Sequence, residues 1–418
     1  MYSPIILSSL AVVIVTYIFV SMRERNYVNV LTPFLVFNVP AYYILELIYE
    51  TLFDVPGSIY AYLFCYSAYA IGFVAMAVGY LAFPARWLPI MIQMPRLRMP
   101  FAPFLFLLIG FLLYLPVLVQ HSDLIASPRE IYMVTRTGFG IQFFLSTFSV
   151  YFSLILLLFS RRVPWLFASL FVLVSMVTLY LHGSKAHVLY FMLIALYFAV
   201  FVKGWRFSFR RVLMLGIAFT AGMILLFYVT LPQTMKEDLI VGIASYSDYT
   251  RNVALVIDDN ALEPQFGRLT AETELFTLVP RAVFPDKPKD FGSYWLAKRY
   301  YPEWFASDTG SPAFGIGVQY ADFGPLAFAW HILAQLLTGI FVKVLVTRLR
   351  LRPDAGTFVL LLPLLHVELI PAGASLPLIV YYPFAMLANV LTTSAAAERL
   401  VNRTGSVPAA DGLMAGAR

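Results

Sequence analysis

Residues Pro4–Met22 read PIILSSLAVVIVTYIFVSM, a run without a charged residue, and Arg23 and Arg25 follow it closely. A helix needs about 20 mostly apolar residues to cross the hydrocarbon core of a bilayer. No basic region precedes the run and no clear small-residue cleavage site follows it, which argues against a secretory signal peptide. The stretch therefore predicts a first transmembrane helix.

The composition of the whole chain agrees with that prediction. Of its 418 residues 61% are hydrophobic and 12% are charged, whereas soluble domains carry about 25% charged residues. The net charge of +6 is interpreted as the positive-inside signal of a membrane protein, not as nucleic-acid binding. The single cysteine, Cys65, can form no intrachain disulfide, so cysteine usage does not identify the compartment.

Apolar stretches recur along the chain and predict an all-α polytopic membrane protein with about eleven transmembrane helices. The expected spans are residues 4–22, 28–48, 58–82, 101–120, 141–160, 163–181, 186–202, 211–231, 313–343, 356–371 and 374–397. Residues 1–400 form one transmembrane domain in this interpretation. The tail 401–418 is expected to be disordered and cytoplasmic.

Orientation follows from the basic residues, because short cytoplasmic loops are enriched in Lys and Arg. Alternate connections and the tail hold 18 of the 29 basic residues, and they define the cytoplasmic face. The N-terminus is then outside and the C-terminus inside. The outer face carries two substantial connections, 121–140 and 232–312, of which the second holds 12 of the 23 acidic residues. Residues 238–259 within it predict a helix that lies on the membrane or packs on the spans.

Basic residues on the outer face are candidates for binding phosphate, since arginine can donate two parallel hydrogen bonds to it. Solvated loop charges paired with nearby acids are the alternative. Three residues stand out: Arg136 beside two glycines, Arg281 between prolines, and Lys185 in the turn HGSKAH. The further candidates for binding are Arg129, Arg251 and Lys287.

Two ionisable residues, His366 and Glu368, fall toward the outer end of the tenth expected span. Such residues are costly in a membrane and are functional candidates by default. Either could act as a general base, although a hydrogen-bonded core histidine and an interfacial carboxylate are the plain alternatives. His331 is expected to be structural. No metal site and no cofactor site is expected, because Glu272 and Glu274 alone are unspecific.

The run PRAVFPDKPKDFGSYW (residues 280–295), followed by GIGVQYADFGPLAF (315–328), resembles the Wzy-type polysaccharide repeat-unit polymerases, which belong to a broader group that includes O-antigen ligases. Some members carry Arg, ten residues and Gly in each of two outer loops. The pairs Arg129/Gly140 and Arg281/Gly292 fit that spacing here. HGSKAH resembles the Gly-Ser-Arg turn of the group with Lys185 in place of Arg, a departure that puts bidentate phosphate binding there in doubt.

The resemblance implies a GT-C-like glycosyltransferase of the bacterial inner membrane that faces the periplasm. The growing glycan would leave undecaprenyl pyrophosphate for a hydroxyl of the incoming lipid-linked repeat unit, with inversion and without a metal. Arg281 and His366 or Glu368 would be catalytic, and Tyr320 and Asp322 of the second motif would join the binding residues. The expected partners are these lipid-linked oligosaccharides, membrane lipids and a chain-length-regulating co-polymerase, but no nucleic acid.

The aromatic-rich stretch 294–305 suits stacking against sugar rings, and interfacial anchoring is the alternative. An O-antigen ligase with a lipid A-core acceptor has the same fold and donor. A lipid-linked sugar transporter is a rival of another class, but transporters usually place charges and repeats at the bilayer midplane. A scaffold protein would not need a stiff loop rich in arginine, proline and aromatic residues.

Overall fold

The protein is described from a computed structural model. The residues described are 2–84, 97, 99–125, 130–131, 139–160, 163–183, 185–230, 240–241, 244, 248–279, 283–306, 312–366 and 377–392. Throughout these residues the regular structure is helical and no strand occurs. The all-α prediction is confirmed for them.

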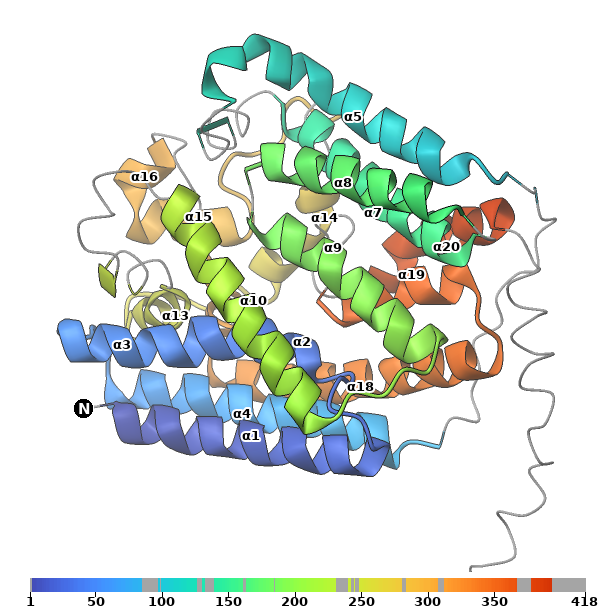
Figure 1. Ribbon diagram of the computed structural model, residues 1–418. Helices are drawn as coiled ribbons and strands as arrows, with labels where there is room; N and C mark the ends of the chain where they lie inside the picture. Colours follow the sequence, from blue (N-terminus) through green and yellow to red (C-terminus); the bar gives the residue numbers. More distant parts are fainter. Residues whose placement is uncertain are drawn as a thin grey trace, which may run out of the picture.

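The elements follow one another as helices joined by short connections (Figure 1). They are α1 (Ser3–Glu24), α2 (Thr32–Asn38), η1 (Val39–Ile44), α3 (Leu45–Leu52), α4 (Ile59–Ala82), α5 (Ala102–Gln120), η2 (Ser122–Leu124), α7 (Gly140–Phe159), α8 (Trp165–Leu181), α9 (Lys185–Tyr197), η3 (Phe198–Val202), α10 (Phe209–Thr230), α13 (Tyr249–Ile257), α14 (Arg268–Leu278), α15 (Ser293–Tyr300), α16 (Pro302–Ala306), α17 (Gly317–Phe323), η4 (Gly324–Leu326), α18 (Ala327–Leu351), α19 (Ala355–Leu364) and α20 (Pro377–Leu391).

Every one of the eleven expected spans contains a helix. Among the described residues, five helical stretches are long and apolar enough to cross a membrane: Ser3–Glu24, Ile59–Ala82, Ala102–Gln120, Gly140–Phe159 and Gly317–Leu351. Shorter apolar helices account for other expected spans. An α-helical polytopic membrane protein follows, while the number of spans and their orientation stay predictions.

Two local features differ from uninterrupted spans. Residues Val39–Ile44 form a π-helical turn that contains Pro40, and a proline inside a helix lacks the N–H donor and widens the local hydrogen bonding. Helix α19 ends at Leu364, immediately after Pro363, and His366 follows in a turn with φ +58°. The expectation that 356–371 is one continuous span is therefore wrong at His366, which is not in a helix.

Helices α1, α4 and α18 lie side by side at one side of the molecule (Figure 1). Close approach of α4 and α18 depends on glycine, because a Cβ on Gly79 or Gly339 would lie closer than 3.0 Å to a backbone carbonyl oxygen of the other helix. His331 of α18 lies against Gly72 in the same interface. Small residues at such crossings let the two backbones pack closely.

The core between the helices is rich in fully buried tyrosines. Several of their hydroxyl groups find partners across helices, among them Tyr43 with Ser9 Oγ (3.0 Å) and Tyr66 with the Tyr42 carbonyl (2.6 Å). A buried hydroxyl without a hydrogen bond is costly. These pairs therefore specify which helices meet, as well as filling the core.

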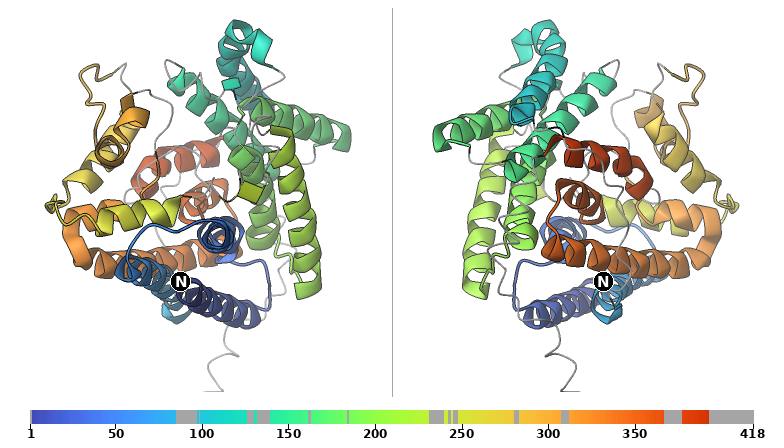
Figure 2. Two further views of the ribbon diagram at one scale, coloured as in Figure 1. Left: turned by 90° about the vertical axis from the view of Figure 1, so that its left-hand side faces the viewer. Right: turned by 90° about the vertical axis from the view of Figure 1, so that its right-hand side faces the viewer.

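Helices α13 to α17 contain the described end of the long loop 232–312 and the start of the next span. They gather toward the end of the bundle where the N-terminus lies (Figures 1 and 2). Tyr2 Oη donates to the Gly57 carbonyl (2.5 Å), and Ser58 meets Asp258 of the long loop nearby. This region therefore joins the long loop to the ends of α1 and α4.

Candidate active site

Helix α13 forms the base of the candidate site and is buried. Asp258 accepts hydrogen bonds from Ser58 N (2.6 Å) and Ser58 Oγ (2.5 Å), which ties the end of α13 to the start of α4. Asn252 donates to the Ala313 carbonyl (3.1 Å) and accepts from Tyr301 Oη (2.6 Å). The expected helix at 238–259 is confirmed over Tyr249–Ile257, where it packs on the spans instead of lying on the membrane surface.

Arg251 of α13 is buried and paired. Its Nε lies 3.4 Å from Oε2 of Glu46 in α3, and its guanidinium carbon is 3.5 Å from the centre of the Tyr49 ring. Tyr62 Oη donates to the other oxygen of Glu46 (2.8 Å). Sequence reasoning selected Arg251 but passed over Glu46, although an acid inside an expected span is itself a functional signal.

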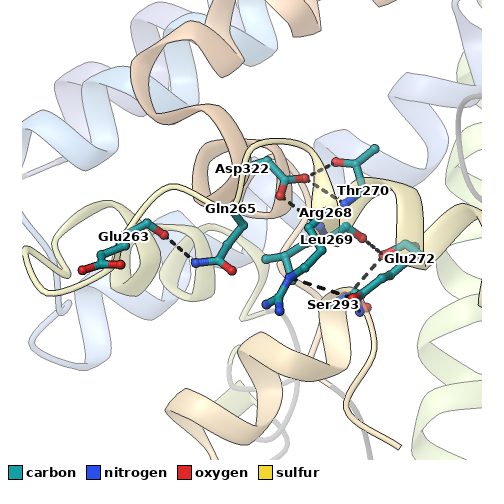
Figure 3. Close-up of polar contacts among 10 residues, drawn as sticks. Glu263, Gln265, Arg268, Leu269, Thr270, Glu272, Ser293 and Asp322 are labelled. Carbon is teal, nitrogen blue, oxygen red and sulfur yellow. Dashed lines mark hydrogen bonds and ion pairs between the residues drawn. The ribbon is translucent and has the colours of Figure 1, made fainter. Parts of the chain in front are cut away.

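Asp322 of α17 connects the second motif to the long loop (Figure 3). Its carboxylate accepts from Leu269 N (3.0 Å), Thr270 N (2.8 Å) and Thr270 Oγ1 (2.6 Å). These donors belong to the first turn of α14, whose N–H groups have no partner within the helix. The contacts of Asp322 thus fix α14 on α17, and its predicted role in substrate binding stays a prediction.

The chain that follows α14 folds back against that helix. Lys287 Nζ donates to the carbonyls of Val279 (3.1 Å) and Phe276, at the end of α14 where carbonyl groups lack helical partners. Gly292 N donates to Glu272 Oε2 (2.8 Å). Gly292 has φ +53°, and a Cβ there would meet Thr273 closer than 3.0 Å. The described chain on both sides of residues 280–282 is therefore held in place.

Arg268 is the exposed arginine at the start of α14. Its side chain is 48% exposed, its Nε lies 3.8 Å from Glu272 Oε1, and its guanidinium carbon is 5.4 Å from the centre of the Trp295 ring. Sequence reasoning counted Arg268 among the outer basic residues without selecting it. Its place beside Trp295 could not be deduced from the sequence, since the two residues are 27 positions apart.

Other charges of the long loop pair with one another. Arg299 Nε lies 2.8 Å from Asp259 Oδ2, and Tyr300 Oη donates to the same oxygen (2.9 Å). The Arg299 guanidinium holds the pKa of the Asp259 carboxyl below its ordinary value. Lys298 lowers the pKa of Asp290 in the same way, with a separation of 2.8 Å. For Arg299 and Lys298 the structure therefore agrees with the alternative that basic residues of the loop pair with nearby acids.

Aromatic side chains of α15 and α16 divide into two groups. Trp295, Tyr300, Tyr301 and Phe305 pack partly buried against the core of the long loop. Trp304 is 60% exposed and Tyr294 is 38% exposed. Trp304 and Tyr294 are therefore the more exposed rings of this stretch.

Both histidines of the turn HGSKAH belong to a buried polar cluster of α7, α8 and α9. His182 Nδ1 is 2.7 Å from the Thr178 carbonyl and its Nε2 is 3.0 Å from Ser146 Oγ. Tyr151 Oη is 3.0 Å from His187 Nδ1. Lys185 begins α9 between these two histidines, so both flanks of the turn are anchored.

The remaining predicted residues are only partly placed. Tyr320 of α17 packs edge-on against Phe64 of α4, with ring centres 5.1 Å apart, and His366 lies in the turn after α19. Four predicted residues, Arg129, Arg136, Arg281 and Glu368, lie outside the described residues. The described structure brings Arg251, Lys287, Tyr320 and Asp322 into one assembly of α13 to α17.

Two proteins of known family are similar to this chain over most of its length. Both are named O-antigen polymerase, one from Salmonella typhimurium strain LT2 and one from Salmonella typhi. Each is 31% identical over 371 residues, which cover 87% of this chain and 89% of the relative. The chain belongs to the O-antigen polymerase family. No protein-family profile matches the chain, and no solved structure matches it.

Membership confirms the function expected from the sequence at the level of the reaction class. This polymerase is a membrane enzyme of glycosyltransferase type that polymerises repeat units. The ligase, transporter and scaffold alternatives lose their support, because the similarity spans nearly the full length of proteins named as polymerases.

Proposed function

We propose that this polymerase transfers the growing glycan from undecaprenyl pyrophosphate to a hydroxyl of the incoming lipid-linked repeat unit. In this proposal the reaction takes place at the face of the bacterial inner membrane that carries the long loop, which is the periplasmic face. The anomeric carbon is inverted, and no metal takes part. A chain-length-regulating co-polymerase is the expected protein partner.

The observation that carries the proposal is the scaffold around residues 280–282. Lys287 and Gly292 bind back to α14, so the chain next to Arg281 starts from fixed positions. Pyrophosphate leaves well once its negative charge is stabilised. An arginine held in place stabilises that charge as it develops, without a cost for reorganising the site. Arg281 is therefore assigned to the leaving pyrophosphate.

Other cations are assigned to substrate binding. They are Arg129, Arg136, Lys185, Arg251 and Lys287, which are proposed to bind the pyrophosphate or the sugars. Glu46 and Tyr49 of α3 hold the Arg251 guanidinium in a buried position. Arg268 adds an exposed guanidinium beside Trp295, a pair that suits a sugar carrying a phosphate.

The attacking hydroxyl needs a base within about 3 Å. His366 and Glu368 are the two candidates. His366 lies in the turn that follows α19 and not in a helix. Trp304 and Tyr294 are assigned to stacking on the sugars of the incoming unit, because their rings are exposed.

A transfer assay with purified protein tests the proposal. The protein receives a lipid-pyrophosphate-linked repeat unit in EDTA, and the products are separated on a gel. A ladder of lengthening glycan on lipid is the expected result. A single transfer that requires lipid A-core would indicate a ligase. Binding of the lipid-linked sugar without any transfer would contradict the proposal and favour a transporter.

A further inference from the structure

Two cavities lie on either side of a pair of hydrogen-bonded chain segments, at the end of the molecule where α1 and α18 end. Residues 26–28 and 205–207 lie side by side there: Phe207 N donates to Asn26 Oδ1 (2.9 Å), and Tyr27 N donates to the Phe207 carbonyl (3.1 Å). Asn26 and Val28 line the first cavity, and Tyr27 lines the second. A molecule with a polar end and an apolar end could occupy both.

The first cavity is polar and has a volume of about 280 Å³. Arg350 lines it and lies 2.7 Å from Glu24, and Arg206 lines it as well. Within the part of the chain that the structure describes, no acidic side chain pairs with Arg206. Two guanidinium groups against one carboxylate leave this wall with a net positive charge.

The second cavity is an apolar groove of about 680 Å³ between α1 and α10. Ile14 and Ile18 of α1 and Ile217 of α10 line it, together with Gly216. Ile217 is 63% exposed, and α10 stands at the edge of the bundle (Figure 2). In a bilayer such a surface is covered by lipid chains.

We propose that the groove and the pocket together hold one anionic phospholipid from the membrane leaflet on the predicted cytoplasmic side, where the connections hold most of the basic residues. Its acyl chains lie between α1 and α10, and its phosphate binds Arg206 and Arg350. Arginine binds phosphate through parallel charge-assisted hydrogen bonds. Basic pockets between transmembrane helices are typical sites for anionic head groups. Trp205, which lines the pocket and is 61% exposed, fits the interfacial belt of aromatic residues.

This lipid is distinct from the polymerase substrate. Helix α1 has 22 residues and is therefore about 33 Å long at a rise of 1.5 Å per residue. Its first residues lie beside the long loop, since Tyr2 contacts Gly57 and Ser58 contacts Asp258. Its last residue, Glu24, lines the polar pocket. A pyrophosphate at the long loop would be about one bilayer thickness away from Arg206.

The test compares two leucine variants of α10 by native mass spectrometry of the purified full-length protein with added phosphatidylglycerol. A Cβ on Gly216 or on Gly222 meets no atom within 4 Å, but only Gly216 lines the groove. Gly216→Leu should lose the bound lipid, and Gly222→Leu should keep it. Arg206→Ala should bind phosphatidylglycerol about ten-fold more weakly, whereas Arg210→Ala, outside the pocket, should bind it normally.

Three results would overturn the proposal. Gly216→Leu could retain as much phosphatidylglycerol as the unaltered protein. Inorganic phosphate alone could stabilise the protein as well as phosphatidylglycerol does, which would identify a site for free anions. Undecaprenyl phosphate could displace phosphatidylglycerol, which would assign the site to the substrate lipid. If Gly216→Leu does not fold, the Arg206 and Arg210 variants decide, because lipid retained by Arg206→Ala also contradicts the proposal.

Discussion

Arg281 is the residue on which the proposed chemistry depends most. Arg281→Lys keeps the charge but removes the planar pair of donors that matches a phosphate. We expect the variant to insert normally and to polymerise about 100-fold more slowly, the size of loss typical for a preorganised donor to a developing charge. The measurement is the initial rate of ladder formation at equal amounts of folded protein.

Arg299→Lys is the matched control, because a lysine can still pair with Asp259 and it lies in the same loop. It should keep most of its activity. Full activity of Arg281→Lys would remove the assignment of Arg281 to the pyrophosphate.

Substitutions of Asp322 distinguish a structural role of its carboxylate from a role in substrate binding. Asp322→Ala leaves three donors of α14 without their acceptor, and each unsatisfied buried group costs about 1–3 kcal/mol. We expect a lower thermal midpoint and faster hydrogen exchange in α14, with a smaller effect for Asp322→Asn, which keeps one acceptor oxygen. Unchanged stability together with lost activity would instead make Asp322 a ligand for the substrate.

At the scale of elements, the sequence predicted where helices occur better than where they end. Each apolar stretch contains a helix, because twenty apolar residues have no other stable form in a bilayer. The sequence did not predict the stop at Leu364, since the turn that contains His366 continues an apolar run. The sequence also did not decide whether α13 lies on the membrane surface or packs on the spans. That choice depends on partners such as Ser58, which is 200 residues away from Asp258 in the chain.

Helix α15 offers a pH-dependent contact. Arg299 and Tyr300 of α15 hold the pKa of Asp259 below its ordinary value of 3.8. A carboxyl with a lowered folded pKa stabilises the folded state above the unfolded pKa, and this contribution is lost as the pH falls through the folded pKa. We expect α15 to keep its hydrogen-exchange protection at pH values above about 4 and to lose it progressively below that.

Asp259→Asn provides the control for this contact. It removes one of the two acids that pair with α15, the other being Asp290 at Lys298, and should give lower protection with a smaller change over the same pH range. A wild-type protection factor for α15 that stays constant down to about pH 2 would contradict the assignment.

At the scale of the whole molecule, contacts between distant parts of the chain assemble the candidate site. Glu46 meets Arg251, and Asp322 meets the start of α14. Composition and periodicity indicate that these segments exist and which residues are polar. They do not indicate which polar groups meet, because in a bundle many pairings of helices bury similar apolar area. The tyrosine hydroxyls and the helix-crossing glycines carry that information, and both look generic in the sequence.

The crossing of α4 and α18 is the clearest case, and it yields the last prediction. A single methyl group on Gly339 would lie closer than 3.0 Å to the carbonyl oxygen of Met76, where only backbone could move. We expect Gly339→Ala to lower stability by about 1–3 kcal/mol or more, as overpacking does, and to reduce the yield of folded protein. Gly222→Ala, with open space at its Cβ, should behave like the unaltered protein. Equal thermal midpoints for the two variants would mean that α4 and α18 do not cross with their backbones in contact. In that case Tyr320 and Asp322, which precede α18 in the chain, would also occupy different positions relative to α4.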